Sequence, residues 1–298
     1  MSLDQFPLIH RGKVRDLYAV GEDRLLMVAS DRLSAFDVVM AEPIPDKGRV
    51  LTAMTAFWLE QVADVVPNAV ISMDPAVIDA ELGVTLPTET HGRTTLARRA
   101  EMVPLECIVR GYLAGQAFSE YDQHGTIHHM AVPTGLRLAD PLPAPMFTPS
   151  TKEEAGHDIN LSIDEATERL GAVLVEEMSA VSLAVYQRAA DRAALAGFIL
   201  ADTKFEFGVV NGELVLCDEV CTPDSSRLWP KAEVVPGETP PAYDKQPFRD
   251  WLEVLGWDKQ PPPPPVPADV VAATAARYRA AYELVTGRSL SDWYGHGS

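Results

Sequence analysis

The segment formed by residues 197–230 constrains the fold of this chain more than any other. Two apolar, strand-like runs flank Asn211-Gly212, a dipeptide typical of a tight hairpin turn. On the first run Asp202, Lys204 and Glu206 alternate with uncharged residues, so the three charges share one strand face. Burying such charges without partners is costly. A Mg²⁺ ion with a triphosphate would be a natural partner, because carboxylates hold the metal and a lysine meets the phosphate.

Length and charge narrow the classes of protein to consider. The 298 residues suffice for one large domain or a few packed lobes. The net charge of −18 argues against general nucleic-acid binding, which depends on Lys and Arg at the phosphates. An anionic substrate would therefore need a local basic pocket that works against the overall field of the protein.

Cysteine content and hydropathy predict the compartment. Three cysteines are a small and odd number, which argues against a disulfide framework. Cys217 and Cys221 lack the second pair of ligands that would complete a zinc site. The amino-terminal residues lack the apolar stretch of a signal peptide, and no run approaches the ~20 apolar residues that span a bilayer. We expect a cytoplasmic protein without membrane or nucleic-acid partners.

Periodicity predicts alternating strands and helices. Residues 8–50 read as strands with a turn at 21–23, residues 50–66 as a helix, and residues 69–103 as further alternating structure. A buried strand at 106–109 follows. The proline-rich stretch 131–160 is expected to be one long functional loop.

The second half of the chain is expected to be more helical. Ser162 and Glu165 form a capping box that opens a helix to about residue 196, and a last helix over 269–286 ends at Gly287. The run of five consecutive prolines within residues 260–271 suggests a stiff spacer, with an SH3-type ligand as the alternative.

Phosphate-binding motifs of the glycine-rich types GxxxxGK[ST] and GxGxxG are absent. A nucleotide site would then use a hairpin lid and charges on strands. Residues 11–15 fit such a lid, because Gly12 allows close backbone approach while Lys13 and Arg15 alternate onto one face. An exposed basic hairpin is the plainer alternative.

Other polar clusters remain ambiguous by themselves. Residues 30–37 could form a polar pocket or a capped turn, and the charged stretch 151–158 could be functional or merely solvated. Arg110 follows a buried strand directly, a good position for an anion. His124, His128 and His129 could suggest a metal, but no convergent cysteine or acidic partner is evident.

Eight blocks in order resemble one family nearly end to end. They are GKVRDLY (12–18), SDRLSAFD (30–37), IPDKGRVLT (44–52), MVPLECIVRGYLAG (102–115), STKEEAGHD (150–158), ADTKFEFG (201–208), DEVCTPDSSRLWP (218–230) and DKQPFRDWL (244–252). Together they resemble the phosphoribosylaminoimidazole-succinocarboxamide synthases, or SAICAR synthetases, of de novo purine biosynthesis.

The resemblance implies an α+β fold related to ATP-grasp, with antiparallel sheets and a kinase-like nucleotide cleft between lobes. A β-rich lobe with the phosphate lid and adenine hinge would span residues 1–103. An α/β lobe with the metal and ribonucleotide sites and a C-terminal helix would span 104–298. A monomer or small homo-oligomer is expected.

The implied reaction joins L-aspartate to carboxyaminoimidazole ribonucleotide (CAIR), using ATP and Mg²⁺. The CAIR carboxylate attacks the γ-phosphate to give an acyl phosphate, and the aspartate amine then displaces phosphate. A kinase or another acyl-phosphate ligase with the same cleft is the alternative. A non-catalytic nucleotide-binding protein would be expected to have lost metal ligands or phosphate lysines, and this chain has kept both.

The family pattern also implies residue roles. Those implied at the nucleotide and metal are Gly12, Lys13, Arg15, Lys204, the backbone at Met102 for adenine, and Glu206 with Asp218 for Mg²⁺. Those implied at the ribonucleotide phosphate are Arg110 and Arg227. Those implied where the two acids meet are Ser34, Lys152, His157 and Asp158, and Asp37, Gln116 and Ser226 are implied as further substrate-binding residues. Catalytic roles are expected for Lys204, Lys152 and Asp202.

One position departs from the family pattern. A serine that contacts the substrate phosphate usually follows the glycine at 115, and this chain has Gln116. The Gln116 amide can donate a hydrogen bond but is longer. We expect a backbone N–H or Arg110 to cover the phosphate.

The metal role has a consequence for strand pairing. A two-residue turn would pair Val210 with Glu213 and place Asp218 opposite Phe205, on the face away from Glu206. A three-residue loop would put Asp218 and Glu206 on one face. We predict this second register, or a bulge with the same effect. A strict two-residue turn would instead favour Glu219 as the second ligand.

Overall fold

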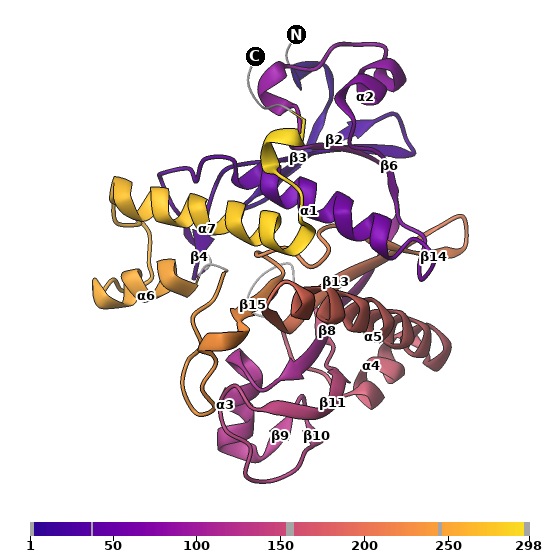
Figure 1. Ribbon diagram of the computed structural model, residues 1–298. Helices are drawn as coiled ribbons and strands as arrows, with labels where there is room; N and C mark the ends of the chain where they lie inside the picture. Colours follow the sequence, from indigo (N-terminus) through magenta and orange to yellow (C-terminus); the bar gives the residue numbers. More distant parts are fainter. Residues whose placement is uncertain (1–2, 37, 153–157, 244–245, 295–298) are drawn as a thin grey trace.

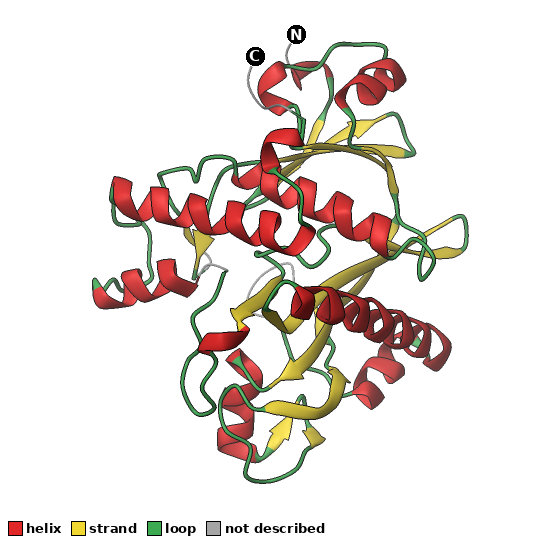
Figure 2. Cartoon of the chain, viewed as in Figure 1, coloured by secondary structure: helices red, strands yellow, loops and turns green. Residues whose placement is uncertain are grey.

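The computed structural model describes residues 3–36, 38–152, 158–243 and 246–294. Two antiparallel sheets form its framework (Figures 1 and 2). In Figure 1 one sheet lies at the top and the other in the lower half, and helices α1 and α7 run side by side between them. This mixed architecture agrees with the predicted α+β class.

The first sheet has the strand order β1-β2-β3-β7-β6. Its strands are β1 (Leu8–Arg11), β2 (Arg15–Val20), β3 (Arg24–Ala29), β6 (Val70–Ser72) and β7 (Thr94–Arg98). The turn between β2 and β3 lies at the expected residues and contains Gly21, whose φ of +65° suits glycine. The hairpin of β1 and β2 brings the predicted lid to the edge of this sheet.

The second sheet has the order β11-β8-β13-β14, with β12 also pairing with β8 and β15 with β13. Its strands are β8 (Glu101–Tyr112), β11 (Pro141–Phe147), β12 (Ser150–Thr151), β13 (Phe198–Val210), β14 (Glu213–Cys217) and β15 (Ser226–Pro230). On β13 Phe205 and Phe207 are fully buried in the core that helix α5 helps to form. The charged face expected from the sequence is the other one.

Two short strand pairs complete the described sheets, β4 (Ser34–Ala35) with β5 (Val38–Val39), and β9 (Thr126–Ile127) with β10 (Met130–Ala131). Short 3-10 helices occupy Leu3–Gln5, Thr88–Thr90, Lys231–Glu233 and Leu290–Asp292.

The main helices are α1 (Lys47–Gln61), α2 (Pro75–Leu82), α3 (Gly115–His124), α4 (Ile163–Leu170), α5 (Ala172–Leu195), α6 (Gln246–Val254) and α7 (Ala268–Thr286). Helix α7 ends as predicted, with Gly287 at φ +72°. The Ser162/Glu165 capping box is present, but Gly171 divides the predicted single helix into α4 and α5.

Two sequence expectations were wrong. Residues 69–103 contain α2, which shows ordinary helix-end residues: Asp74 caps it, Pro75 starts it, and Gly83 follows at φ +66°. The stretch 131–160 is not one loop, because it contains β11 and β12. Strand β11 tolerates its prolines because it lies at a sheet edge, where the missing N–H groups can face away from the ladder.

The register of the β13–β14 hairpin also corrects the prediction. Val210 pairs with Glu213 across a two-residue turn at Asn211 and Gly212, both at positive φ, and the pairing runs without a bulge to Glu206 opposite Cys217. The two-residue turn wins because Asn-Gly tolerates the two positive φ angles that match strand twist.

The chain changes sheets at residues 99–100, between β7 and β8. This is close to the predicted lobe boundary after residue 103, which falls inside β8. However, α7 from the end of the chain packs on α1. The division at 103/104 therefore stays a prediction. In the described part of the chain no helix has both the length and the apolar character needed to cross a bilayer.

Candidate active site

A pocket of about 330 Å³ lies where the lid hairpin faces the second sheet. Its walls combine apolar side chains of both sheets with charged groups at one end. The predicted residues that line it are Gly12, Lys13, Arg15, Met102, Lys152, Glu206 and Asp218. The structure therefore brings the lid, the hinge position and the carboxylates together around one space.

Arg15 and Lys152 neutralise the carboxylates of this pocket. The Arg15 guanidinium forms ion pairs with Asp218 and, at 2.6 Å from Nη2 to Oε1, with Glu219. Lys152 pairs with Glu206. Each carboxylate is thus held by a cation that a phosphate could also attract.

Asp218 reaches this pocket in spite of the unexpected register. Strand β14 ends at Cys217, and Asp218 has φ +57°, outside the alternation of the ladder. A residue in the left-handed region turns the chain, so strand alternation no longer decides where its side chain points. Asp218 and Glu219 consequently line the same pocket as Glu206.

The charged face of β13 continues away from this pocket. Lys204 donates to Glu106 of β8 at 2.6 Å. Burial raises the pKa of Glu106, and the positive charge of Lys204 opposes that rise. Burial alone would lower the pKa of Lys204, but the neighbouring carboxylates of Glu106, Glu206 and Asp158 raise it overall. Both shifts show how closely these groups are coupled in a region of limited water.

At the far end of this face Asp202 lies between two arginines. Arg110 Nη1 donates to Asp202 Oδ2 at 2.9 Å, and Arg227 pairs with the same carboxylate. Arg110 is only 4% exposed, and burial lowers its pKa, with Asp202 opposing that change. Its other donors face Thr148 Oγ1 at 3.1 Å and His128 Nε2 at 3.5 Å. Arg110 is therefore a buried anchor, and Arg227, whose side chain is 30% exposed, is the more accessible guanidinium.

Arg227 borders a second, smaller pocket of about 110 Å³. Its lining residues are Asp202, Pro223, Asp224, Ser225, Ser226, Arg227 and Arg249. The Arg227 guanidinium also lies against Gly115, the first residue of α3, where an added Cβ would meet Nη2 at 2.4 Å. A helix start, two guanidiniums and two hydroxyls suit a phosphate group.

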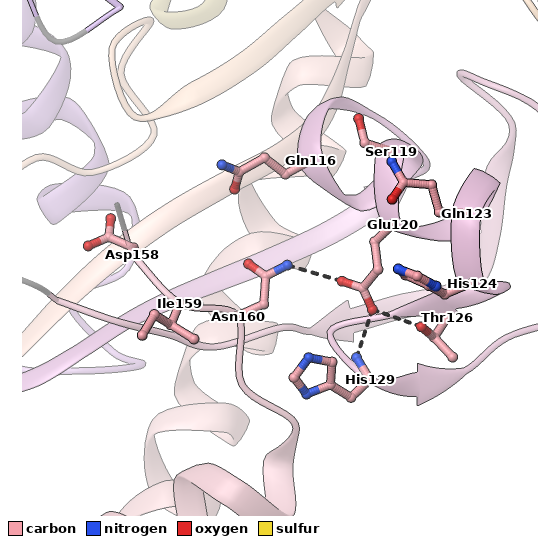
Figure 3. Close-up of a pocket in the computed structure, with 10 residues that line it drawn as sticks. All are labelled: Gln116, Ser119, Glu120, Gln123, His124, Thr126, His129, Asp158, Ile159 and Asn160. Carbon is pink, nitrogen blue, oxygen red and sulfur yellow. Dashed lines mark hydrogen bonds between the residues drawn. The ribbon is translucent and has the colours of Figure 1, made fainter. Parts of the chain in front are cut away.

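A third, open groove of about 710 Å³ contains Gln116 and Asp158 (Figure 3). Glu120 of α3 organises its wall by accepting hydrogen bonds from Thr126, Asn160 and the backbone N–H of His129. This network holds the β9–β10 turn, in which His128 and His129 both have positive φ.

Three further residues were predicted for the site: Ser34, Asp37 and His157. Ser34 is half-buried in β4 and lines none of these three pockets. Asp37 and His157 lie outside the described residues. Within the described part of the chain, no three His, Cys, Asp or Glu side chains are gathered closely enough to hold a metal ion, the histidines 124, 128 and 129 included.

Reasoning from sequence missed several polar residues of these pockets and this face, among them Glu106, Asp224 and Arg249, and gave Glu219 only as the alternative metal ligand. Glu106 could have been found from its position, because a carboxylate inside an apolar strand needs a partner. Asp224 and Arg249 lie in the family motifs at 218–230 and 244–252, but only the tertiary structure brings them beside Arg227.

Comparisons with known proteins agree with this geometry. A sequence model described as SAICAR synthetase matches residues 8–264. The phosphoribosylaminoimidazole-succinocarboxamide synthase of Saccharopolyspora erythraea is 50% identical over 98% of both chains, and that of Chromobacterium violaceum is 50% identical over 94% of this chain and 98% of its own.

Solved structures give the same answer. The SAICAR synthase of Saccharomyces cerevisiae complexed with SAICAR has a TM-score of 0.87 and 40% identity, covering 95% of this chain and 96% of its own. The Pyrococcus horikoshii SAICAR synthetase shares the fold at 22% identity and a TM-score of 0.67, covering 92% and 98% of the two chains. The chain therefore belongs to the SAICAR synthetase family, the ligases that join L-aspartate to CAIR in purine biosynthesis.

Proposed function

We propose that this chain performs the family reaction along the charged face of β13, with ATP at one end and the ribonucleotide at the other. The observation that carries the proposal is the row of three ion pairs along β13, Lys152–Glu206, Glu106–Lys204 and Asp202–Arg227, because Glu206 lines the larger pocket and Asp202 the smaller one.

The larger pocket supports the nucleotide end. Its apolar walls suit a purine ring, and Met102 stands at the start of β8, beside the chain segment that links the sheets. Lys13 and Arg15 come from the lid hairpin and face the carboxylate end. The adenine would contact the backbone near Met102, and the phosphates would lie under the lid.

The carboxylates of this pocket fit Mg²⁺. Glu206, Asp218 and Glu219 supply hard oxygen donors on one wall, next to lysine and arginine that can pass to the phosphates. Mg²⁺ commonly takes only one or two protein carboxylates together with phosphate oxygens and water, so a cluster of three is not required. When bound, the ion would neutralise phosphate charge. Glu206 with Asp218 is the proposed pair, and Glu219 the alternative partner.

The smaller pocket supports the ribonucleotide end. Arg227 and Ser226 would hold the 5′-phosphate, with Arg249 on the same wall. Asp202 and the buried Arg110 would keep Arg227 in place, which is a positioning role for both residues and not direct contact with the reacting atoms. Gln116 and Asp158 would lie along the groove between substrate and solvent.

The reaction asks for activation of a carboxylate. The CAIR carboxylate oxygen attacks the γ-phosphorus of ATP and ADP leaves, giving an acyl phosphate. The aspartate amine then attacks the acyl carbon, loses its proton, and expels phosphate to form the amide. Lys204 and Lys152 would stabilise the negative charge that moves between these groups, since phosphoryl transfer depends mainly on positioning and charge neutralisation.

An assay of the purified protein with Mg²⁺, ATP, L-aspartate and CAIR tests the proposal. We expect ADP release that requires both other substrates, with SAICAR formed in equal amount. ADP formed without aspartate, together with a stable phosphorylated product, would instead identify a kinase. The cytoplasmic location and the monomeric or small oligomeric state remain predictions.

A further inference from the structure

The Asp224 carboxylate receives hydrogen bonds from two distant parts of the chain. Lys47, at the start of α1, donates to Oδ2 at 2.7 Å, and the Tyr278 hydroxyl, in the middle of α7, donates to Oδ1 at 2.5 Å. The Lys47 ammonium also lies 5.6 Å from the centre of the Tyr278 ring. Three elements therefore meet at one carboxylate.

This meeting point is buried. Lys47 and Tyr278 are 0% exposed, and the Asp224 side chain is 7% exposed. A buried lysine and aspartate are tolerated when they pair closely and their remaining hydrogen-bonding capacity is met. The Tyr278 hydroxyl contributes to that second requirement without adding charge.

Asp224 nevertheless borders the small pocket that holds Ser226, Arg227 and Arg249. Its loop is tied to β13, because Lys204 N–H donates to the Ser225 carbonyl. Within the loop, Asp224 N–H donates to the Thr222 hydroxyl. A shift of the Asp224 carboxylate would therefore be felt at the wall of this pocket.

A carboxylate beside a phosphate site needs a reason. Without a counter-charge, the Asp224 carboxylate would repel an incoming phosphate; the Lys47 ammonium supplies that counter-charge. When the Asp224 carboxylate is held in a fixed orientation, it can accept hydrogen bonds from uncharged donors such as the hydroxyl groups of a phosphorylated sugar. Charge compensation by Lys47 and orientation by Tyr278 are separable, because removing the tyrosine hydroxyl leaves the ion pair intact.

We propose that Tyr278 of the C-terminal helix is a positioning residue of the ribonucleotide pocket, which acts by orienting Asp224. The inference rests on the proposed function, since it takes the small pocket as the ribonucleotide site. It assigns to α7 a part in substrate binding although the helix lines none of the three pockets described above.

Tyr278→Phe tests the role with little change of shape. We expect the dissociation constant for CAIR, measured by calorimetry without ATP or aspartate, to rise about tenfold, as for the loss of a hydrogen bond to a charged acceptor. The dissociation constant for ATP should stay within about twofold of wild type. Thermal unfolding of each variant reports whether the fold is retained.

Tyr282→Phe is the matched control. Tyr282 lies one turn further along α7 and is also buried, but its hydroxyl hydrogen-bonds with Thr286. We expect this variant to bind CAIR like wild type. A general loosening of α7 would affect both variants alike and would overturn the inference.

A double-mutant cycle with Asp224→Asn distinguishes action through Asp224 from an independent effect. We expect Tyr278→Phe to weaken CAIR binding little further once Asp224→Asn is present. Additive losses would contradict the proposal, as would an unchanged CAIR affinity of Tyr278→Phe. If the wild-type protein itself fails to bind CAIR, the proposed function fails first, and this inference with it.

Discussion

His128 shows how much structure a single side chain can organise. It is fully buried, has φ +47°, and its Nδ1–H donates to the Pro149 carbonyl at 2.8 Å. Arg110 can only donate a hydrogen bond, so Nε2, 3.5 Å from Arg110 Nη2, is the acceptor and the ring is neutral. Its backbone N–H donates to Glu120. A strained backbone is retained here because it seats an imidazole against the guanidinium that orients Asp202.

His128 should make stability depend on pH. Burial, and then Arg110, lower its pKa from 6.5 to about 4. The unfolded chain therefore takes up this proton first, so the contribution is fully present above pH 6.5 and is lost as the pH falls toward 4. The loss amounts to about 3 kcal/mol of unfolding free energy between pH 7 and pH 4.

His128→Asn removes the titration while keeping a residue that tolerates positive φ. Urea unfolding at several pH values should show a shallower loss of stability for this variant between pH 7 and pH 4. Equal slopes for wild type and His128→Asn would refute the assignment.

Helix α3 has a left-handed glycine at each end, and the two are not equivalent. At the start, Gly115 has φ +56° and an added Cβ would meet Arg227. At the end, Gly125 has φ +71° and nothing within 4 Å. The first glycine is needed for both conformation and space, the second for conformation alone.

Gly115→Ala should therefore displace Arg227. We expect a rise of about tenfold or more in KM for CAIR, the effect of disturbing one charged contact, with KM for ATP nearly unchanged. Gly125→Ala pays the same backbone cost of about 1–2 kcal/mol and should lower stability without this change in KM. Steady-state kinetics with each substrate varied in turn measures the difference, and similar CAIR kinetics for the two variants would speak against Arg227 as a ligand.

Over the whole molecule, the end of the chain holds the first sheet and α1 together. Arg49 of α1 is buried and donates to the carbonyls of Trp293 and Tyr294. Trp293 Nε1 donates to the Gly92 carbonyl at 2.7 Å, just before β7. These contacts fasten Trp293 and Tyr294 to α1 and to the segment just before β7, and Figure 1 shows α1 and α7 side by side beneath the first sheet.

Gly92→Ala should disrupt the contacts of Gly92 with Trp293 and Tyr294. Gly92 has φ +73°, and an added Cβ would approach the Tyr294 carbonyl oxygen to 2.0 Å. Gly83→Ala has the same backbone cost at φ +66° but meets nothing within 4 Å. We expect Gly92→Ala to lower the melting temperature roughly 5 °C more than Gly83→Ala and to speed hydrogen exchange in residues 288–294. Equal melting temperatures and equal exchange would contradict the role of this contact.

Local features of this protein followed from the sequence because they depend on neighbouring residues. The alternating charges of β13, the Ser162/Glu165 capping box and the end of α7 at Gly287 all depend on residues within one element, whereas the register of the Asn-Gly hairpin was predicted wrongly. The ordered motif blocks added the family, and with it the fold class and the reaction.

Only the tertiary structure decided which distant groups meet. Asp218 reaches the pocket because its own left-handed conformation turns the chain after β14 ends. Arg110 is buried as an anchor for Asp202, and Lys47 and Tyr278 both contact Asp224. Such outcomes depend on packing and charge pairing between segments that lie far apart in the chain. Strand alternation describes where a side chain points only while the strand lasts, and Asp218 and Glu219 lie just after β14 ends.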